Sequence, residues 1–487
     1  MTSTVEAAGV RLPATGLHVL GEARAAVGGG TFEVLDPSTG QALARVADAS
    51  PDDVDPAVAA AASALRTWSR SAPGARAQVL ERAAALLLER TEELAALISA
   101  ESGKSLRDAR GEIRYSADFF RWYAGEALRL DGVSRRSPSG DYWILTRQEP
   151  IGVVAVVTPW NFPAAMIARK VAPAVAAGCT CVVKPPEEAP LTSLALAALL
   201  EEAGLPAGVV NVLPTADAPR VVARLLEHPA VRKISFTGST EVGRRLLRAS
   251  AERVLATSME LGGNAPFIVF DDADLDDAVQ GALAAKMRGC GQACTAANRF
   301  LVHEDIADEF TARLVRVMAA LRPGSASAEE TEVGPLVSAR ARDGVHRLVR
   351  GAIGRGARLA LGGELPEGAG YHYPPTVLDH VAPDDPLVTT EIFGPVAAVV
   401  RFSTEAQAVD LANDSEMGLA SYVFSRDLAR ALRVADALEV GMVGINRGLV
   451  SDAAAPFGGT KQSGLGREGG SEGVQEYLET KYIAVDW

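Results

Sequence analysis

The stretch from Ile151 to Ser250 alternates between short apolar runs and helical segments, and no other feature of the chain limits its fold so strongly. Runs of strand length occupy residues 151–158, 180–184, 209–213 and 233–236, and helical segments occupy residues 164–177, 192–203, 219–226 and 239–250. Short strands rich in Val and Ile that alternate with helices predict a parallel sheet with right-handed crossovers. Because such sheets bind ligands beyond the carboxyl ends of their strands, the residues after each run are the first candidates for a site.

The remainder of the chain contains a second α/β region and an extended arm. The second region has apolar runs at 265–270, 299–302, 396–402, 421–425 and 442–446, with helical patterns at 274–287, 307–321, 338–354 and 428–438. Residues 141–149 are predicted to form an extended arm, and residues 481–487 alternate like an edge strand. A terminal strand needs a partner edge, so we expect it to pair with another subunit together with the arm.

Composition and charge exclude several classes of protein. The 487 residues allow two or three domains, and the net charge of -13 opposes nucleic acid or an anionic membrane as a general partner. The N-terminus lacks the apolar core of a signal peptide, and the apolar stretches are too short to span a bilayer, so we expect a cytoplasmic protein. Four cysteines do not make a disulfide framework and are not spaced for a zinc site, so no metal is predicted.

Cys294 ends the small-residue turn Gly289-Cys290-Gly291-Gln292-Ala293-Cys294, which follows a helical pattern. Glu260 lies upstream in Met259-Glu260-Leu261-Gly262-Gly263. A thiolate is a good nucleophile, and a nearby carboxylate can act as a general base. The alternative is that Cys294 is a small apolar core residue, the commoner fate of a free cysteine, and the cysteine by itself favours that alternative.

Polar or glycine-containing motifs follow several of the predicted strands. They are Thr158-Pro159-Trp160-Asn161-Phe162-Pro163, Lys184-Pro185-Pro186-Glu187 and Phe236-Thr237-Gly238-Ser239-Thr240, with Glu391-Ile392-Phe393-Gly394-Pro395 preceding a strand. The turn before a helix can hold a phosphate on free N–H groups, and an Asn amide in a stiff loop can face an oxyanion. Each motif also has an ordinary interpretation as a helix cap, a solvated charge or a turn, and the usual Gly-x-Gly-x-x-Gly dinucleotide motif is absent.

Taken together and in order, these motifs resemble the aldehyde dehydrogenase superfamily along nearly the whole chain. The matching motifs are Pro159-Trp160-Asn161, Lys184-Pro185-x-Glu187, Phe236-Thr237-Gly238-Ser239, Glu260-Leu261-Gly262-Gly263, Gly291-Gln292-x-Cys294, Glu391-x-Phe393-Gly394-Pro395 and Pro456-Phe457-Gly458-Gly459. The resemblance implies an α/β fold with three parts. These are a Rossmann-type parallel-sheet NAD(P)-binding domain from residues 1–130 and 151–258, an α/β catalytic domain at 259–462, and a β oligomerisation arm from 131–150 and 463–487.

The resemblance also implies a mechanism. Cys294 attacks the aldehyde carbonyl, the Asn161 amide and the Cys294 backbone N–H hold the tetrahedral oxyanion, and hydride passes to the nicotinamide. Glu260 then activates the water that hydrolyses the thioester, and Lys170 matches a family lysine that favours the thiolate. The chemistry is sound, because the tetrahedral adduct carries the negative oxygen from which hydride can be expelled.

The family resemblance places the cofactor along the predicted strand ends. It implies Lys184 and Glu187 at the adenine ribose, Ser239 at the pyrophosphate, and Glu391 with Phe393 at the nicotinamide ribose. The implied cofactor site is completed by Thr158, Pro159, Trp160 and Gly238. The Glu187 carboxylate would repel a 2′-phosphate, which gives a slight preference for NAD over NADP, although Lys184 could still hold that phosphate.

Within the superfamily, the local sequence looks like that of succinate-semialdehyde dehydrogenases. The resembling stretches are 161–170, 448–451 and 461–469. Arg169, Arg288 and Ser451 fall where that group of enzymes grips the substrate carboxylate, and a guanidinium pairs with a carboxylate through two parallel hydrogen bonds. The alternative for Arg288 is that its charge only stabilises the C-terminus of the preceding helix through the helix dipole.

The sequence departs from that group of enzymes in two places. Some members have a second cysteine two residues after the nucleophile, where this chain has Ala296, and Cys290 instead precedes Cys294 by four residues. Cys290 is expected to be a packing residue, with a Cys290–Cys294 disulfide as the less favoured hypothesis. Arg447 has no assigned role.

The leading hypothesis is therefore oxidation of succinate semialdehyde to succinate in a homodimer or homotetramer. The alternatives are a dehydrogenase of glutarate semialdehyde or another short aldehyde, a coenzyme A-acylating enzyme, and a non-catalytic protein of the same fold. Retention of both Cys294 and Glu260 speaks against the last of these.

Overall fold

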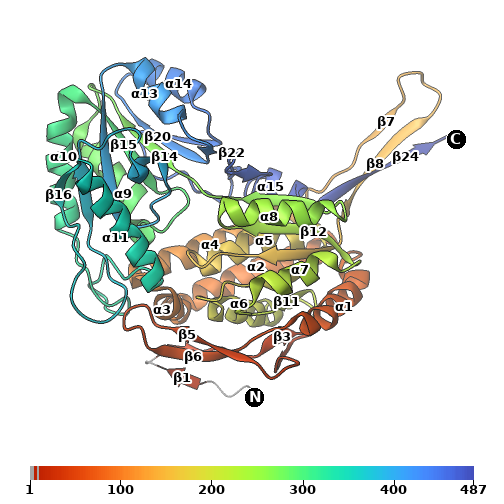
Figure 1. Cartoon of the computed structure of the whole chain (residues 1–487). Helices are drawn as coiled ribbons and strands as arrows, with labels where there is room; N and C mark the ends of the chain where they lie inside the picture. The colour runs from red at the N-terminus through yellow and green to blue at the C-terminus, as the bar shows by residue number, and fades with distance from the viewer. Residues whose placement is uncertain (1–4, 8–9, 487) are drawn as a thin grey trace.

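The computed structural model describes residues 5–7 and 10–486, so the ends of the predicted segments at residues 1–4, 8–9 and Trp487 lie outside it. Two sheets, each flanked by helices, form two lobes, and a long β arm projects from one of them (Figure 1). The α/β fold class predicted from the sequence is confirmed.

The first sheet is the one predicted from residues 151–250. Its spatial order is β23 (Gly464–Leu465), β13 (Ala256–Glu260), β12 (Val231–Thr237), β9 (Val153–Val157), β10 (Thr180–Lys184), β11 (Val210–Val212), β3 (Leu17–Val19) and β4 (Glu22–Arg24). The strands from β13 to β11 run parallel, so their carboxyl ends share one edge. The crossover helices are α5 (Pro163–Ala177), α6 (Leu191–Glu202), α7 (Ala218–Glu227) and α8 (Thr240–Ala251).

The N-terminal helices pack against this lobe and complete its core (Figure 1). They are α1 (Pro51–Trp68), α2 (Pro73–Glu89), α3 (Thr91–Ser102) and α4 (Leu106–Ala127), and the hairpin β5 (Thr31–Leu35) and β6 (Ala42–Ala47) precedes them. Helix α4 contacts α5 directly. The two helices are joined by the Glu112 carboxylate, which accepts hydrogen bonds from the N–H groups of Ala164 (2.8 Å) and Ala165 (3.1 Å) at the start of α5. A carboxylate is a favourable cap for a helix N-terminus.

The second sheet is parallel except at one edge strand. Its spatial order is β16 (Arg358–Leu361), β17 (Thr376–Asp379), β18 (Val396–Phe402), β15 (Ala297–His303), β14 (Ala265–Val269), β20 (Ala420–Phe424) and β21 (Met442–Ile445). The helices of this lobe are α9 (Leu275–Met287), α10 (Glu304–Ala319), α11 (Ala339–Gly354), α12 (Pro386–Thr389), α13 (Glu405–Asn413) and α14 (Leu428–Ala437). Its core is separate from those of the first sheet.

The arm is a three-stranded antiparallel sheet in the order β24 (Leu478–Val485), β8 (Trp143–Pro150) and β7 (Ser134–Arg136). The sequence predicted that the terminal strand pairs with another subunit. Within the chain β24 pairs with the arm strand β8, in an unbroken register from Leu478 opposite Pro150 to Val485 opposite Trp143, and the pairing with another subunit stays a prediction. The short helix α15 (Glu472–Gln475) precedes β24 in the chain, and Leu478 pairs with Pro150 at the end of β8. The outer edge of β24 has no strand beside it among the described residues.

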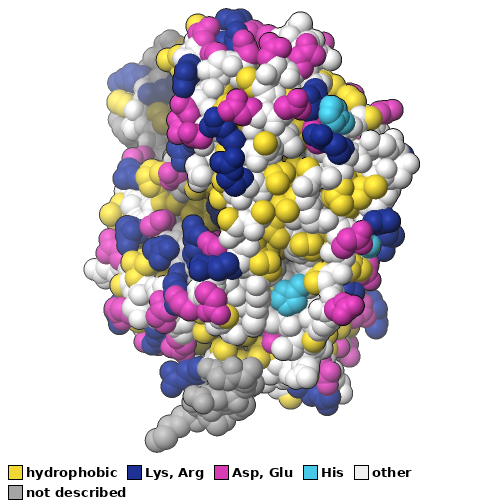
Figure 2. Space-filling view, turned by 90° about the vertical axis from the view of Figure 1, so that its left-hand side faces the viewer, with side chains coloured by type: hydrophobic (Ala, Val, Ile, Leu, Met, Phe, Trp, Pro, Cys, Tyr) yellow, Lys and Arg dark blue, Asp and Glu magenta, His cyan; other side chains and the backbone are white. Residues whose placement is uncertain are grey.

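On the face that Figure 2 shows, positive and negative side chains are not separated into patches. There, Lys and Arg side chains are mixed with Asp and Glu side chains around a central band of hydrophobic ones (Figure 2). Over the residues that the structure describes, no helix is both long and apolar enough to cross a bilayer.

Candidate active site

A cleft lies where the carboxyl ends of β9, β12 and β13 approach the second lobe. Its volume is about 680 Å³, including the part open to solvent. The lining residues are Pro159, Trp160, Asn161, Thr237, Gly238, Ser239, Leu261, Gly262, Cys294, Glu391 and Phe393. Every motif predicted for the chemistry except Lys184-Pro185-x-Glu187 and the Pro456 turn therefore contributes directly to this one cavity.

The turn that carries Cys294 is shaped by three consecutive residues with positive φ. Helix α9 ends at Met287, and Gly289, Cys290 and Gly291 adopt φ angles of 59°, 59° and 73°. Gly291 is required here, because a Cβ would lie 2.1 Å from the carbonyl oxygen of Gly394. The turn reverses the chain and leaves Cys294 half-buried at the floor of the cleft.

The motif that contains Glu260 meets the Cys294 turn in space. A Cβ on Gly263 would lie 2.2 Å from the carbonyl oxygen of Cys294, so only glycine permits this approach. Glu260, at the end of β13, is buried, and its Oε2 atom has no hydrogen-bond partner among the described residues. Burial raises the pKa of Glu260 well above its usual range, and the neighbouring Glu468 raises it further. An unpaired carboxylate oxygen and a raised pKa are properties that suit a general base.

Burial also raises the pKa of the Cys294 thiol to about 12, with Arg169 as the strongest opposing influence. Glu391 and Glu260 raise the pKa of this thiol as well, because negative charge disfavours a thiolate. The thiol is therefore protonated at neutral pH in the ligand-free protein, and its attack on a carbonyl requires a base to remove the proton.

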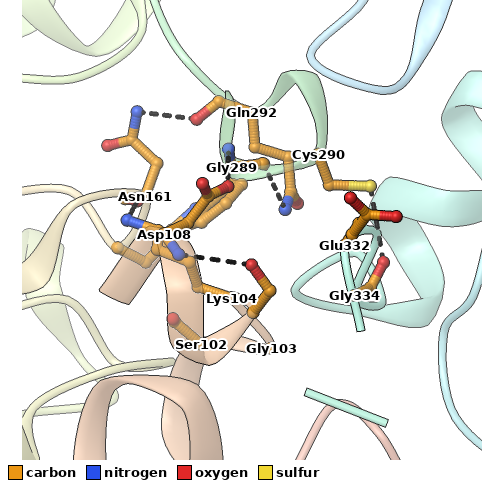
Figure 3. Close-up of a pocket in the computed structure, with 12 residues that line it drawn as sticks. Ser102, Gly103, Lys104, Asp108, Asn161, Gly289, Cys290, Gln292, Glu332 and Gly334 are labelled. Carbon is orange, nitrogen blue, oxygen red and sulfur yellow. Dashed lines mark hydrogen bonds between the residues drawn. The ribbon is translucent and has the colours of Figure 1, made fainter. Parts of the chain in front are cut away.

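Asn161 is held against the nucleophile turn. Its Nδ2 group donates a hydrogen bond to the carbonyl oxygen of Gln292 (3.0 Å), and Oδ1 has no partner among the described residues (Figure 3). An amide has two N–H donors, so one remains for a ligand. The carbonyl oxygen of Asn161 accepts a hydrogen bond from Lys104 Nζ (2.8 Å), and Asp108 accepts one from the N–H of Gly289 (2.7 Å). The segment from Lys104 to Asp108 thus contacts both the Asn161 loop and the Cys294 turn.

The Cys290 side chain faces Gly334. Its Sγ lies 3.4 Å from the carbonyl oxygen of that residue (Figure 3). All four cysteines are free, and burial raises the pKa of the Cys290 thiol to about 12. This geometry agrees with the expectation of a packing residue and gives no support to a Cys290–Cys294 disulfide.

Lys170 and Arg169 share one carboxylate that the sequence motifs did not assign a role. Both side chains, on α5, form ion pairs with the buried Glu468, and Lys170 Nζ also donates to Ser235 Oγ (3.3 Å). The Arg169 guanidinium lies 3.9 Å from the ring centroid of Phe457 and keeps Nη2 unpaired among the described residues. Because Arg169 and Lys170 share the single carboxylate of Glu468, the cluster carries a net positive charge, and Arg169 acts on the Cys294 thiol. The sequence signal that could have revealed Glu468 is its place in the 461–469 stretch.

Arg288 and Ser451, the other residues predicted to contact substrate, are partly exposed. The Arg288 guanidinium lies 5.1 Å from the ring centroid of Phe162 and forms no hydrogen bond or ion pair with a described residue. Arg288 follows α9 directly, and a positive charge at that helix C-terminus interacts favourably with the helix dipole. The lack of an ionic partner nevertheless leaves its five N–H donors available to a ligand.

The cleft also offers unfilled donors and space for a dinucleotide. The buried Oγ1 atoms of Thr158 and Thr237 have no hydrogen-bond partner among the described residues. A Cβ on Gly238 would lie 2.5 Å from the Phe236 ring, so only glycine fits at this position and no side chain covers its backbone. Ser239 caps α8 by accepting a hydrogen bond from Val242 N–H (3.4 Å), which leaves this helix N-terminus facing the cleft.

Of the remaining predicted cofactor residues, Glu391 and Phe393 line this cavity and Lys184 and Glu187 lie outside its lining. Lys184 is buried at the end of β10, where burial lowers its pKa, and Glu187 is exposed. Glu391 accepts a hydrogen bond from Gly263 N–H (3.2 Å), and burial raises its pKa to about 7. The Phe393 ring meets Trp160 edge to face at 5.4 Å. These groups fit a nicotinamide dinucleotide, with hydroxyl-binding groups at both ends and a helix N-terminus between them.

One cluster outside the cleft has the composition of a cation site. Asp308, Asp379 and His380 bring their ligand atoms together in the described part of the chain. Arg401 forms ion pairs with both carboxylates (2.7 and 3.0 Å), so a positive charge is already in place.

Comparison with known proteins identifies the family. Residues 25–483 match the model of the aldehyde dehydrogenase family. A succinate-semialdehyde dehydrogenase of Paenarthrobacter nicotinovorans is 53% identical over 91% of this chain and 98% of its own length. A 3-sulfolactaldehyde dehydrogenase of Pseudomonas putida is 48% identical over 94% of both chains. The crystal structure of a succinate-semialdehyde dehydrogenase from Burkholderia pseudomallei superposes with a TM-score of 0.96 at 46% identity, covering 98% of both chains.

The chain belongs to the aldehyde dehydrogenase family. It is an NAD(P)-dependent aldehyde dehydrogenase that resembles the succinate-semialdehyde dehydrogenases. Its relatives include enzymes named for different aldehydes and proteins named as mitochondrial, so the substrate and the compartment are not decided by similarity.

Proposed function

We propose that this enzyme oxidises succinate semialdehyde to succinate. The observation that carries the proposal is Arg288, a guanidinium without an ionic partner at the start of the turn that presents Cys294. Arg169 on α5 adds a second positive charge, which lowers the pKa of the Cys294 thiol. An aldehyde whose other end is a carboxylate would be anchored by these arginines with its carbonyl directed at the thiol.

Each side chain of the site has a separate proposed role in the reaction. Cys294 Sγ attacks the carbonyl carbon after losing its proton, and the free N–H of the Asn161 amide stabilises the resulting oxyanion. A nicotinamide held by the cofactor residues described below would supply the oxidising power, as the acceptor of hydride from this adduct. Glu260, as the base with a raised pKa, then takes a proton from the water that hydrolyses the thioester on Cys294.

The cofactor site is proposed to run from Lys184 and Glu187 to Glu391 and Phe393. The Lys184 ammonium and the Glu187 carboxylate would bind the adenine ribose, and Glu391 would bind the nicotinamide ribose. Thr158, Pro159 and Trp160 form the wall beside Asn161, with Gly238 and Ser239 at the pyrophosphate. The exposed Glu187 supports the slight preference for NAD, since its charge opposes a 2′-phosphate.

Substitution of Arg288 by Ala tests the substrate. We expect kcat/KM for succinate semialdehyde to fall about 30-fold or more relative to kcat/KM for butanal, because one side of a desolvated charge pair is removed at a cost of about 2–5 kcal/mol. Arg248→Ala, at an exposed position on α8, is the matched control. Equal losses on the two aldehydes would contradict the assignment.

Glutarate semialdehyde and sulfonated aldehydes are the alternative substrates. A relative named 3-sulfolactaldehyde dehydrogenase shares 48% identity, and a sulfonate is an anion that arginines also bind. Arg447 is exposed three residues before Val450, close in sequence to the proposed substrate residue Ser451. A steady-state comparison of semialdehydes of increasing length and of 3-sulfolactaldehyde, with both cofactors, would rank these possibilities.

A further inference from the structure

Tyr115 carries a buried hydroxyl with nothing to bind. The residue lies on α4 (Leu106–Ala127), and its Oη atom is inaccessible to solvent and has no hydrogen-bond partner among the described residues. Such a group costs stability, because it has left water without gaining a protein partner. Unsatisfied buried donors in native proteins therefore call for a reason, and a ligand that completes the hydrogen bond is one.

The surroundings of Tyr115 show what kind of ligand would complete it. Its ring meets Phe119 edge to face at 4.9 Å, and the Arg169 guanidinium lies 5.4 Å from the centroid of the same Phe119 ring. Tyr115 also packs against the small apolar cluster that contains Phe162, and Arg288 lies over the Phe162 ring. The tyrosine is thus flanked by both arginines of the proposed substrate site.

The same apolar cluster joins Tyr115 to the nucleophile turn. Its other members include Ala293 and Ala296, which bracket Cys294. Burial raises the pKa of Tyr115, while Arg169, Arg288 and Ser451 act to lower it. Ser451 is near enough to lower the pKa of the phenol, yet the Tyr115 Oη atom has no hydrogen bond among the described residues. A phenol that stays protonated at neutral pH is a donor, and the two guanidiniums beside it favour an anionic acceptor.

We propose that the Tyr115 hydroxyl donates a hydrogen bond to the substrate carboxylate held between Arg169 and Arg288, and that it is a specificity-determining residue of this enzyme. The inference rests on the proposed function. It adds a neutral donor from α4 to the cationic donors from α5 and the Cys294 turn. With donors converging from three elements, the site selects the position of the carboxylate as well as its charge.

Tyr115→Phe removes only the hydroxyl. We expect the ratio of kcat/KM for succinate semialdehyde to that for butanal to fall about 10- to 100-fold, the range for a hydrogen bond to a charged group. Tyr482→Phe, exposed on β24, is the control. An unchanged ratio would overturn the proposal.

A thermal-shift measurement separates a ligand-binding role from a structural one. In the ligand-free protein we expect Tyr115→Phe to unfold at the same temperature as the wild type or higher, because the hydroxyl has no partner to lose. Added succinate should raise the midpoint of the wild type more than that of the variant. A lowered midpoint with equal response to succinate would show a structural role and overturn the proposal. If Arg288→Ala discriminates between the aldehydes and Tyr115→Phe does not, the proposed function stands and this inference alone fails.

Discussion

Glu260 illustrates how a single residue acquires its chemistry from its surroundings. A carboxyl group in water has a pKa near 4.5, too low for an efficient base at neutral pH. Burial at the end of β13 raises that pKa, and Glu468 raises it further, while Arg169 and Lys170 act in the opposite direction. The surroundings therefore shift the pKa of Glu260 upward overall, against the opposing effect of two cations.

The pH profile of Glu260→Gln tests this residue. Because a base acts when deprotonated and the pKa of Glu260 is raised, wild-type kcat should rise with pH well above the range of an ordinary carboxyl group. For Glu260→Gln we expect a burst of NADH followed by turnover about 10²- to 10⁴-fold slower, without that rise in kcat. Stopped-flow absorbance at several pH values measures both phases. Normal turnover by the variant would remove Glu260 from the mechanism.

At the scale of elements, the segment from Lys104 to Asp108, which leads from the α3–α4 link into the first turn of α4, contacts both the Asn161 loop and the Cys294 turn. Lys104 binds the carbonyl oxygen of Asn161 and lies 3.6 Å from the centroid of the Phe162 ring, while Asp108 binds the N–H of Gly289 (Figure 3). Lys104 also forms a buried ion pair with Glu112, the carboxylate that caps α5. One short segment thus contacts both Asn161, the proposed oxyanion donor, and the turn that carries Cys294, the proposed nucleophile.

Asp108→Ala would loosen the turn without touching any reacting atom. We expect kcat to fall about tenfold or more with a smaller change in KM, since a small misplacement of the nucleophile slows the chemical step. Asp118→Ala, an exposed acid-to-alanine change on the same helix, is the matched control. The rate of Cys294 alkylation by iodoacetamide provides a second measurement, and equal kcat values for the two variants would contradict a positioning role.

At the scale of the whole molecule, the β arm is the part that packs least against the rest of the chain (Figure 1). Its sheet projects away from both lobes, and the outer edge of β24 carries backbone groups without a strand partner among the described residues (Figure 1). Unpaired edges are sites of association. The proposal of a homodimer or homotetramer rests on this arm.

Removal of residues 478–487 tests the assembly. The deletion takes away β24 and with it the whole register opposite β8, so we expect sedimentation velocity to show a smaller species than the full chain. Removal of residues 486–487 alone, beyond the last paired residue Val485, is the control and should sediment like the full chain. Identical sedimentation of both truncated chains would exclude β24 from the interface.

Local sequence was sufficient for the elements and for the motifs. The strand β10 lies at residues 180–184 as predicted, and α5 and α9 begin within one residue of their predicted starts, because strand and helix periods and helix caps are written in neighbouring residues. The sequence also placed Cys294 in a turn after a helix and Asn161 in a loop after a strand. The parallel fold then brings these loops to one edge.

What only the tertiary structure decided are the contacts between residues far apart in the chain. Glu468 pairs with Arg169 and Lys170 from almost 300 positions away, and nothing in its own neighbourhood predicts those partners. The same holds for the unsatisfied hydroxyl of Tyr115 and for the direction of the Cys290 sulfur. Sequence determined which groups are available and on which elements they lie. Packing determined which of them lose water, which find a partner and which are left free for a substrate, because burial and pairing depend on three-dimensional neighbours and not on chain order.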